Sequence, residues 1–275
     1  METFEWKWNS RDGIELVSLG WKPASPKAVV VLIHGHGEHI NRYQHVAEAL
    51  TNAGYAMQAF DLRGHGRSAG NRGHTPSYEH LMNDITDFIS DAQKRYPGLP
   101  VFLYGHSMGG NQVINYALKT PGILKGVIAT GPWLKLAFDP PAAQVMVAKL
   151  LNGIAPSFSL ASGLSQSALS RDLEVVKKYA ADPLVHDKIS VRLYTSMYGN
   201  GLWALEHAAD LKIPMLLMHG SADGLTSAAA SEEFAKKAGK LVTLRIWEGF
   251  YHEIHNEPEK FEVLQTIVTW LDQQV

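Results

Sequence analysis

The 275-residue chain contains no cysteine. Without thiols it can form no disulfide bond, no thiolate metal site and no cysteine nucleophile, so any nucleophile must be another side chain. It also lacks a long apolar run. No stretch approaches the ~20 residues that span a bilayer, and the first residues lack the apolar core of a signal peptide. The sequence therefore predicts a cytoplasmic protein.

An excess of charge of either sign is missing as well. The chain has 25 Lys and Arg residues against 27 Asp and Glu residues, a formal net charge of −2, and its basic residues form no run. Such a chain has no broad attraction for polyanions, so nucleic acid is not expected as a partner. Its 45% hydrophobic content and its length indicate one globular domain that carries an insertion.

What the chain does have is a regular alternation of strand and helix patterns. Residues 3–8 and 15–21 alternate around a polar turn, which predicts an antiparallel hairpin. From residue 28 onward, apolar β-branched runs alternate with amphipathic stretches, as expected for a mostly parallel central sheet with helices on both faces. The expected strands are residues 28–33, 55–60, 101–104, 126–129, 215–218 and 242–247, and the expected helices are residues 42–52, 78–96, 110–119, 231–238 and 261–271.

The alternation is interrupted between residues 132 and 209. This stretch contains two consecutive prolines, amphipathic segments at 143–151 and 172–179, and no convincing strand. It lies between two core strands at the carboxyl edge of the sheet, where open α/β folds bind ligands. We therefore expect a core formed by residues 1–131 and 210–275, and a helical cap (lid) formed by residues 132–209.

The most specific motif is Gly105-His106-Ser107-Met108-Gly109, a G-x-S-x-G between an expected strand and an expected helix. In this context the glycines permit a sharp turn that projects the serine hydroxyl above the sheet. The motif predicts that Ser107 is a nucleophile. The alternative is a tight turn with an incidental serine.

A serine nucleophile needs a general base and an acid that orients the base. In this topology both follow the serine, each after a late strand. Asp223 and His252 stand at those two places, and we expect them to complete the triad with Ser107. Asp61 also ends a core strand, but it precedes the serine and is interpreted as a loop anchor. The other competitors, all close to His252 in sequence, are Glu248, Glu253 and His255.

The segment His34-Gly35-His36-Gly37 follows the first parallel strand. Its glycines allow the backbone to bend over the nucleophile, and the N–H groups of His36 and Met108 are candidates for an oxyanion hole. A metal site is an alternative reading of the 13 histidines. However, the His252 motif spaces its histidines three apart instead of the four of H-E-x-x-H, so no metal and no other cofactor is expected.

Five segments together extend this reading. They are HGHGEHINRY (34–43), FDLRGHGRSAGNRGH (60–74), GHSMGG (105–110), HGSADGL (219–225) and EGFYHEIHNE (248–257). In combination they resemble the monoacylglycerol lipase and lysophospholipase branch of the α/β-hydrolase superfamily, over most of the chain outside the cap. One departure is His36, where that branch commonly has a small residue.

The resemblance implies an α/β-hydrolase fold and an ester hydrolase that cleaves monoacylglycerols to fatty acid and glycerol. It implies Ser107, Asp223 and His252 as the triad and the N–H groups of His36 and Met108 as the oxyanion hole. It further implies that the glycerol end of the substrate is bound by Glu38, Arg42 and His255.

Four other functions stay open at this point. They are a broad-specificity esterase, a lysophospholipase, another serine-nucleophile chemistry such as amide or carbon-carbon bond hydrolysis, and a non-catalytic ligand-binding protein on the same fold. The expected partner is a lipid ester. Apolar residues in the cap also suggest transient contact with a membrane or lipid interface, which would make the protein peripheral at membranes.

Overall fold

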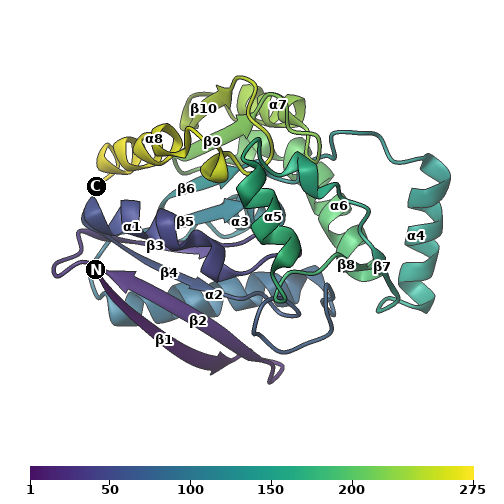
Figure 1. Cartoon of the computed structure of the whole chain (residues 1–275), viewed down its shortest axis with the longest axis horizontal. Helices are drawn as coiled ribbons and strands as arrows, with labels where there is room; N and C mark the ends of the chain where they lie inside the picture. The colour runs from purple at the N-terminus through teal and green to yellow at the C-terminus, as the bar shows by residue number, and fades with distance from the viewer.

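An eight-stranded sheet forms the centre of the protein in the computed structural model, which describes residues 1–275 (Figure 1). The strand order is β1-β2-β4-β3-β5-β6-β9-β10. β1 (Glu2–Asn9) and β2 (Glu15–Lys22) form the expected antiparallel hairpin, and β2 also pairs antiparallel with β4. The other pairings are parallel, among β3 (Ala28–Ile33), β4 (Tyr55–Phe60), β5 (Val101–His106), β6 (Leu124–Thr130), β9 (Met215–Gly220) and β10 (Val242–Trp247). The predicted α/β fold is confirmed.

Helices cover both faces of the sheet (Figure 1), which explains why β3, β4 and β5 are buried throughout. Because side chains of a strand alternate between faces, Val29 and Val31 belong to one apolar cluster, whereas Val30 and Leu32 belong to the other. The helices α1 (Gln44–Asn52) and α8 (Lys260–Asp272) pack in the second cluster. The first cluster includes residues of α2 (Tyr78–Arg95), α3 (Met108–Lys119) and α7 (Ala228–Ala238).

The inserted segment is more varied than the sequence predicts. It contains α4 (Ala142–Ile154), α5 (Leu173–Ala181) and α6 (Val191–Glu206). The expectation that it holds no strand is wrong, because β7 (Ser159–Ala161) and β8 (Lys188–Ser190) form a small antiparallel sheet. Strands of three residues are too short to produce a recognisable alternation in sequence. The 3-10 helices are η1 (Ile40–Tyr43), η2 (Gln166–Ala168), η3 (Ala208–Asp210), η4 (Gly239–Leu241) and η5 (Ile254–Asn256).

The helices of the insertion relate to the core in different ways. α6 packs against α3, and it also lies directly against the segment that follows β6, because a Cβ on Gly201 would come within 2.3 Å of the Leu134 carbonyl oxygen. In contrast, α4 projects from the right of the molecule in Figure 1 and has no buried residue. None of the helices combines the length and apolar character needed to cross a membrane.

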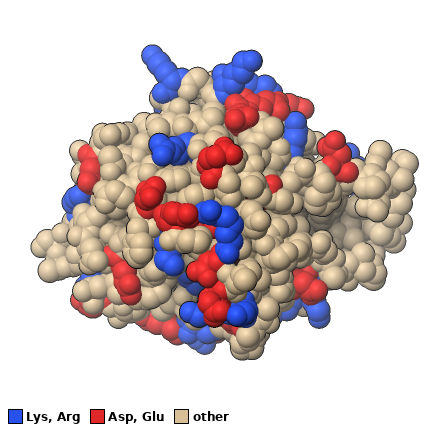
Figure 2. All heavy atoms as spheres, turned by 45° about the horizontal axis from the view of Figure 1, so that its top comes forward, with Lys and Arg blue, Asp and Glu red and all other residues tan.

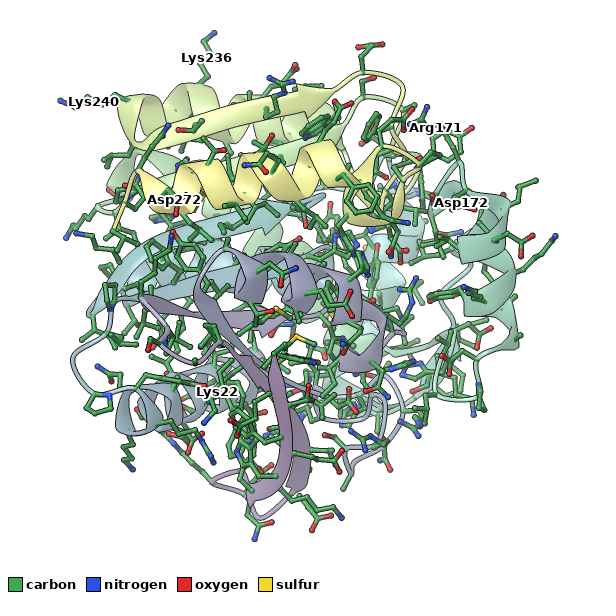
Figure 3. The ribbon with its side chains drawn as sticks, turned by 60° about the vertical axis from the view of Figure 1, so that its left-hand side comes forward. Lys22, Arg171, Asp172, Lys236, Lys240 and Asp272 are labelled. Atoms are coloured by element: carbon green, nitrogen blue, oxygen red, sulfur yellow. The ribbon has the colours of Figure 1, made fainter.

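Several contacts hold the insertion over the carboxyl edge of the sheet, and two of them lie at either end of α5. The Arg171 guanidinium, which precedes α5, binds Glu257 at 2.9 Å; Figure 3 labels Arg171 and Asp172 at the start of that helix. Farther along, the N–H of His186 donates to the Gly37 carbonyl at 3.0 Å. Gly37 has a φ of +75°, and a Cβ there would lie 2.3 Å from the His186 oxygen, so only glycine fits this contact. The insertion therefore rests directly on the loop that follows β3.

Candidate active site

Ser107 sits at the sharp turn between β5 and α3. Its φ of 55° is the only positive value at a non-glycine residue, a conformation that costs about 1–3 kcal/mol and is held by the surrounding structure. A Cβ on Gly105 would lie 2.3 Å from the Gly109 oxygen, and a Cβ on Gly109 would lie 2.1 Å from the Ile33 oxygen. Both glycines of the motif are therefore required for this turn.

Asp223 follows β9 and His252 follows β10, and the parallel sheet brings them together. The Nδ1 atom of His252 lies 2.7 Å from Oδ2 of Asp223. The other carboxylate oxygen accepts the N–H groups of Leu225 at 2.8 Å and Thr226 at 3.0 Å. The carboxylate is thus fixed with one oxygen facing the imidazole.

This contact governs the charge of both groups. Burial disfavours the ionised form of Asp223, but the nearby His252 and hydrogen bonds from His219 and His252 outweigh it and hold the pKa of Asp223 below its ordinary range. For His252, burial disfavours the imidazolium, yet Asp223 raises the pKa of His252 above its ordinary value. His252 is therefore suited to accept a proton and to be stabilised while it carries the proton.

Two residues near Asp223 were not expected from the sequence. Nε2 of His219 lies 3.0 Å from Oδ2 of Asp223, and the hydroxyl of Thr226 donates to the same oxygen at 2.8 Å. The other nitrogen of His219 contacts the Ser231 hydroxyl at 2.8 Å. His219 belongs to the HGSADGL segment and stands near the end of β9, four residues before Asp223. This position is the sequence feature that could have identified it as a partner of Asp223.

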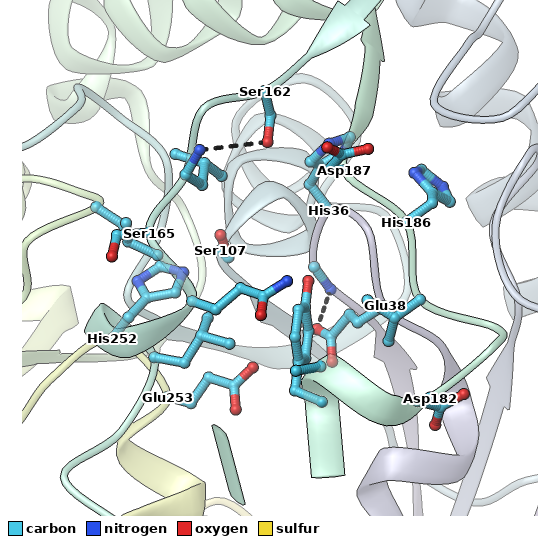
Figure 4. Close-up of a pocket in the computed structure, with 18 of the residues that line it drawn as sticks. His36, Glu38, Ser107, Ser162, Ser165, Asp182, His186, Asp187, His252 and Glu253 are labelled. Atoms are coloured by element: carbon cyan, nitrogen blue, oxygen red, sulfur yellow. Dashed lines mark hydrogen bonds between the residues drawn. The ribbon is translucent and has the colours of Figure 1, made fainter. Parts of the chain in front are cut away.

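Ser107 and His252 line the same cavity, which has a volume of about 270 Å³. Figure 4 shows Ser107 at its centre, with His252 on one side and His36 and Glu38 on the other. The insertion supplies much of the remaining wall. Its apolar contribution is Leu164, Leu169, Ala180 and Val185, and its polar contribution includes Ser162, Ser165, Tyr179, Asp182, His186 and Asp187. Sequence reasoning did not identify these residues, because they reach the site only through the path of the insertion.

The two expected oxyanion donors lie beside Ser107. The backbone N–H of His36 donates to no other group of the chain. Met108 is the first residue of α3, so its N–H has no intrahelical acceptor. The His36 ring lines the cavity and packs edge-on against His65 and His186, with centroids at 5.5 and 5.6 Å. Burial lowers the pKa of His36 to about 3, so this ring is neutral. No three His, Asp or Glu side chains are arranged to hold a metal ion.

The three residues expected to bind glycerol lie at different depths. Glu38 lines the cavity, whereas Arg42 and His255 do not. Arg42 lies behind Glu38, at 2.7 Å from its carboxylate. His255 is fully buried, with its ring centroid 5.0 Å from that of Tyr43 and 4.7 Å from that of His106. A direct contact with a ligand in the cavity is thus available to Glu38 alone.

A second cavity, of about 590 Å³, adjoins the first and is mostly apolar. The two share Ser162 and Leu164 in their walls. Residues of α4 form part of this second wall, together with Val191 and Tyr194 of α6, and Figure 2 shows the surface hollowed beside the projecting part on the right. A polar chamber that holds Ser107 therefore opens beside an apolar one, an arrangement suited to a ligand with one polar and one apolar end.

Comparisons with known proteins agree with this geometry. Residues 24–259 match the hydrolase family described as serine aminopeptidase, S33. A monoacylglycerol lipase of Mycolicibacterium smegmatis is 37% identical over 262 residues, which cover 94% of this chain and 93% of that protein. An abhydrolase domain-containing protein of Dictyostelium discoideum is also 37% identical, but the chain spans only 27% of its length.

Among solved structures, a monoacylglycerol lipase of Paleococcus ferrophilus superposes with a TM-score of 0.86 at 38% identity, covering 100% of both chains. A soluble variant of a monoglyceride lipase from Saccharomyces cerevisiae superposes with a TM-score of 0.89 at 24% identity. That second likeness concerns the fold alone. The chain belongs to the serine aminopeptidase S33 family and is a serine hydrolase with the α/β-hydrolase fold.

Proposed function

We propose that this protein hydrolyses monoacylglycerols to fatty acid and glycerol, with Ser107, His252 and Asp223 as its catalytic triad. The observation that carries the proposal is the adjoining pair of chambers, one polar and holding Ser107 and His252, the other apolar. The relatives named monoacylglycerol lipase support the same substrate class.

In this mechanism Oγ of Ser107 attacks the ester carbonyl carbon while His252 removes the hydroxyl proton. Asp223 holds the imidazole through its Nδ1 and stabilises the imidazolium that forms. The N–H groups of His36 and Met108 stabilise the negative oxygen of the tetrahedral intermediate. His252 then donates its proton to the leaving glycerol oxygen. Water, activated by the same histidine, hydrolyses the acyl-enzyme.

The apolar chamber would hold the acyl chain. Its wall includes Trp133, Leu151 and Phe158, and each methylene buried there would contribute about 0.8 kcal/mol. The polar chamber would hold the glycerol end, with Glu38, Asp182 and other cap groups as hydrogen-bond partners of its hydroxyls. Arg42 and His255 would support that end from behind the cavity wall.

A neutral head group suits this chamber better than an anionic one. Its wall contains four carboxylates and no Lys or Arg; the carboxylates are Glu38, Asp182, Asp187 and Glu253. Arg42, which pairs with Glu38 behind the wall, is already bound to two carboxylates. A lysophospholipid phosphate would meet negative charge without a free counter-charge, so monoacylglycerol is favoured over lysophospholipid.

We also propose that residues 132–209 act as a cap that contacts lipid surfaces. Large apolar side chains of this segment are exposed, among them Met146, Leu150 and Ile154 on α4. A helix with such a face can lie at a bilayer interface without crossing it. Contact there would place the entrance of the apolar chamber near the substrate.

A hydrolysis panel tests the proposed function. We expect rapid cleavage of monoacylglycerols, weaker cleavage of lysophosphatidic acid, and little cleavage of triacylglycerols, whose second and third chains have no apolar wall in the polar chamber. Released fatty acid is measured for each substrate at matched acyl chain length. Efficient triacylglycerol hydrolysis, or a preference for the anionic lipid, would contradict the assignment.

A further inference from the structure

The guanidinium of Arg42 lies between two carboxylates that belong to different loops. Its Nη1 donates to Glu38 and to Glu253, and its Nη2 donates to the second oxygen of Glu253, all at 2.7 Å. Both carboxylates are 2% exposed. Charge-assisted hydrogen bonds of this length in a buried setting fix the relative positions of the groups they join.

On one side, the hydrogen bonds of Arg42 lead through Glu38 to the loop that carries His36, here called the oxyanion loop. Oε1 of Glu38 accepts the N–H of Gly35 at 2.6 Å and the hydroxyl of Tyr43 at 2.8 Å. Figure 4 shows the first of these bonds beside the cavity. The carboxylate lies so close that a Cβ on Gly35 would be 2.7 Å from it. Because His36 follows Gly35 directly, Glu38 holds the peptide unit immediately before the one whose N–H faces the developing oxyanion.

On the other side the network reaches the loop of the general base. Glu253 follows His252 directly in the sequence, and its Oε2 also accepts the side-chain N–H of Asn256 at 2.8 Å. Burial disfavours the ionised form of Glu253, but Arg42 outweighs it and lowers the pKa of Glu253 to about 2. Glu253 is therefore a charged partner of Arg42 at neutral pH.

The cap covers the same cation. The ring of Tyr179, on α5, lies 4.7 Å from Cζ of Arg42. The guanidinium thus contacts three segments that are far apart in the chain: the oxyanion loop, the His252 loop and the cap.

We propose that Arg42 and Glu253 are positioning residues for catalysis, which hold the oxyanion N–H of His36 and the imidazole of His252 in register around Ser107. This inference rests on the proposed triad. It assigns to Arg42 a role that does not depend on the alcohol part of the substrate. A residue that binds glycerol would affect only substrates that contain glycerol.

The variants Arg42→Lys and Glu253→Gln test the proposal. Lysine lacks the planar guanidinium that donates to both carboxylates in a fixed geometry. Glutamine keeps the shape of Glu253 but loses its charge. We expect kcat to fall on both a monoacylglycerol and a p-nitrophenyl ester of the same chain, by up to about 10²-fold, with KM little changed. The rate at which a fluorophosphonate labels Ser107 should fall in parallel.

The dependence of kcat/KM on pH is a second measurement, because a variant that only loses stability would keep the wild-type acid limb. The ionisable groups that face His252 are Asp223, Glu253, Glu38, His106 and His255. The Glu253 charge stabilises the His252 imidazolium, so Glu253→Gln should move the acid limb of kcat/KM to lower pH.

Asp84→Asn is the matched control. Asp84 forms a buried ion pair with Arg63, at 2.7 Å, and neither residue lines the cavity of Ser107. This variant should lower thermal stability as the Arg42 and Glu253 variants do, while its folded fraction keeps wild-type kcat and labelling rate.

Loss confined to the monoacylglycerol, or unchanged kcat and labelling rate in folded Glu253→Gln protein, would overturn the proposal. Failure of wild-type protein to cleave monoacylglycerols would contradict the proposed function only. The ester and labelling measurements would still decide the positioning role.

Discussion

The protonation states of single residues at the site depend on burial and on neighbouring charges. His252 must be neutral to accept the Ser107 proton, and Asp223 raises its pKa above the ordinary value of 6.5. Activity should therefore be present above that raised pKa and be lost as the pH falls through it.

The variant Asp223→Asn should lower kcat by about 10⁴-fold, because the imidazole loses the partner that orients it. Its residual activity should show an acid limb at lower pH than wild type, since the charge that raises the His252 pKa is gone. The measurement is kcat/KM against pH for wild type, Asp223→Asn and Asp210→Asn, whose exposed carboxylate lies outside the site. An unchanged acid limb in Asp223→Asn would show that another group governs the profile.

Sequence predicted the residues that stand at strand ends. Ser107, Asp223 and His252 each follow a parallel strand, and the carboxyl ends of parallel strands meet at one edge, so their proximity follows from topology. The pairing of Arg42 with Glu253 was not predictable in this way. The two residues are far apart in the chain, and only the packing of their loops brings them together.

At the scale of elements, the sheet was predictable because its central strands β3, β4, β5 and β9 are buried throughout, and the helices between them carry amphipathic patterns. The inserted segment was predictable only in part. α4 and α5 coincide with the amphipathic segments expected at 143–151 and 172–179, whereas its two strands have three residues each and were not expected. α6 illustrates this difference. Leu193 and Met197 pack into the core cluster, although the helix belongs to the segment expected to be a separate cap.

The helix α4 carries the prediction for lipid contact. Leu150 and Ile154, one helical turn apart, are 65% and 83% exposed, and replacing both with Glu would place two charges on the apolar face. We expect slower hydrolysis of monoacylglycerol presented in vesicles and less binding to those vesicles, because charge disfavours the interface.

Hydrolysis of a water-soluble short-chain ester should be unchanged in the same double variant. Phe261→Glu is the control, because Phe261 is 75% exposed and belongs to α8, a helix that lies away from α4 in Figure 1. Equal vesicle binding by wild type and the α4 variant would rule out lipid contact through this helix.

At the scale of the whole molecule, the site lies where the core and the insertion meet. The core supplies Ser107, Asp223 and His252, and the insertion supplies much of the wall of the Ser107 cavity and of the apolar chamber. The positions of these three residues were therefore predictable from the core motifs. The shape and charge of the chambers required the three-dimensional path of residues 132–209.

The most direct test of the account is glycerol release from a long-chain monoacylglycerol by wild-type protein and by Ser107→Ala. Wild type should hydrolyse the substrate and accumulate a covalent adduct on Ser107 with a fluorophosphonate, read by intact-protein mass. Ser107→Ala should fold normally, form no adduct and lose all but about 10⁻⁶ of the turnover. Ser157→Ala, an exposed cap serine outside both cavities, should match wild type. Near-normal turnover by folded Ser107→Ala protein would contradict the mechanism.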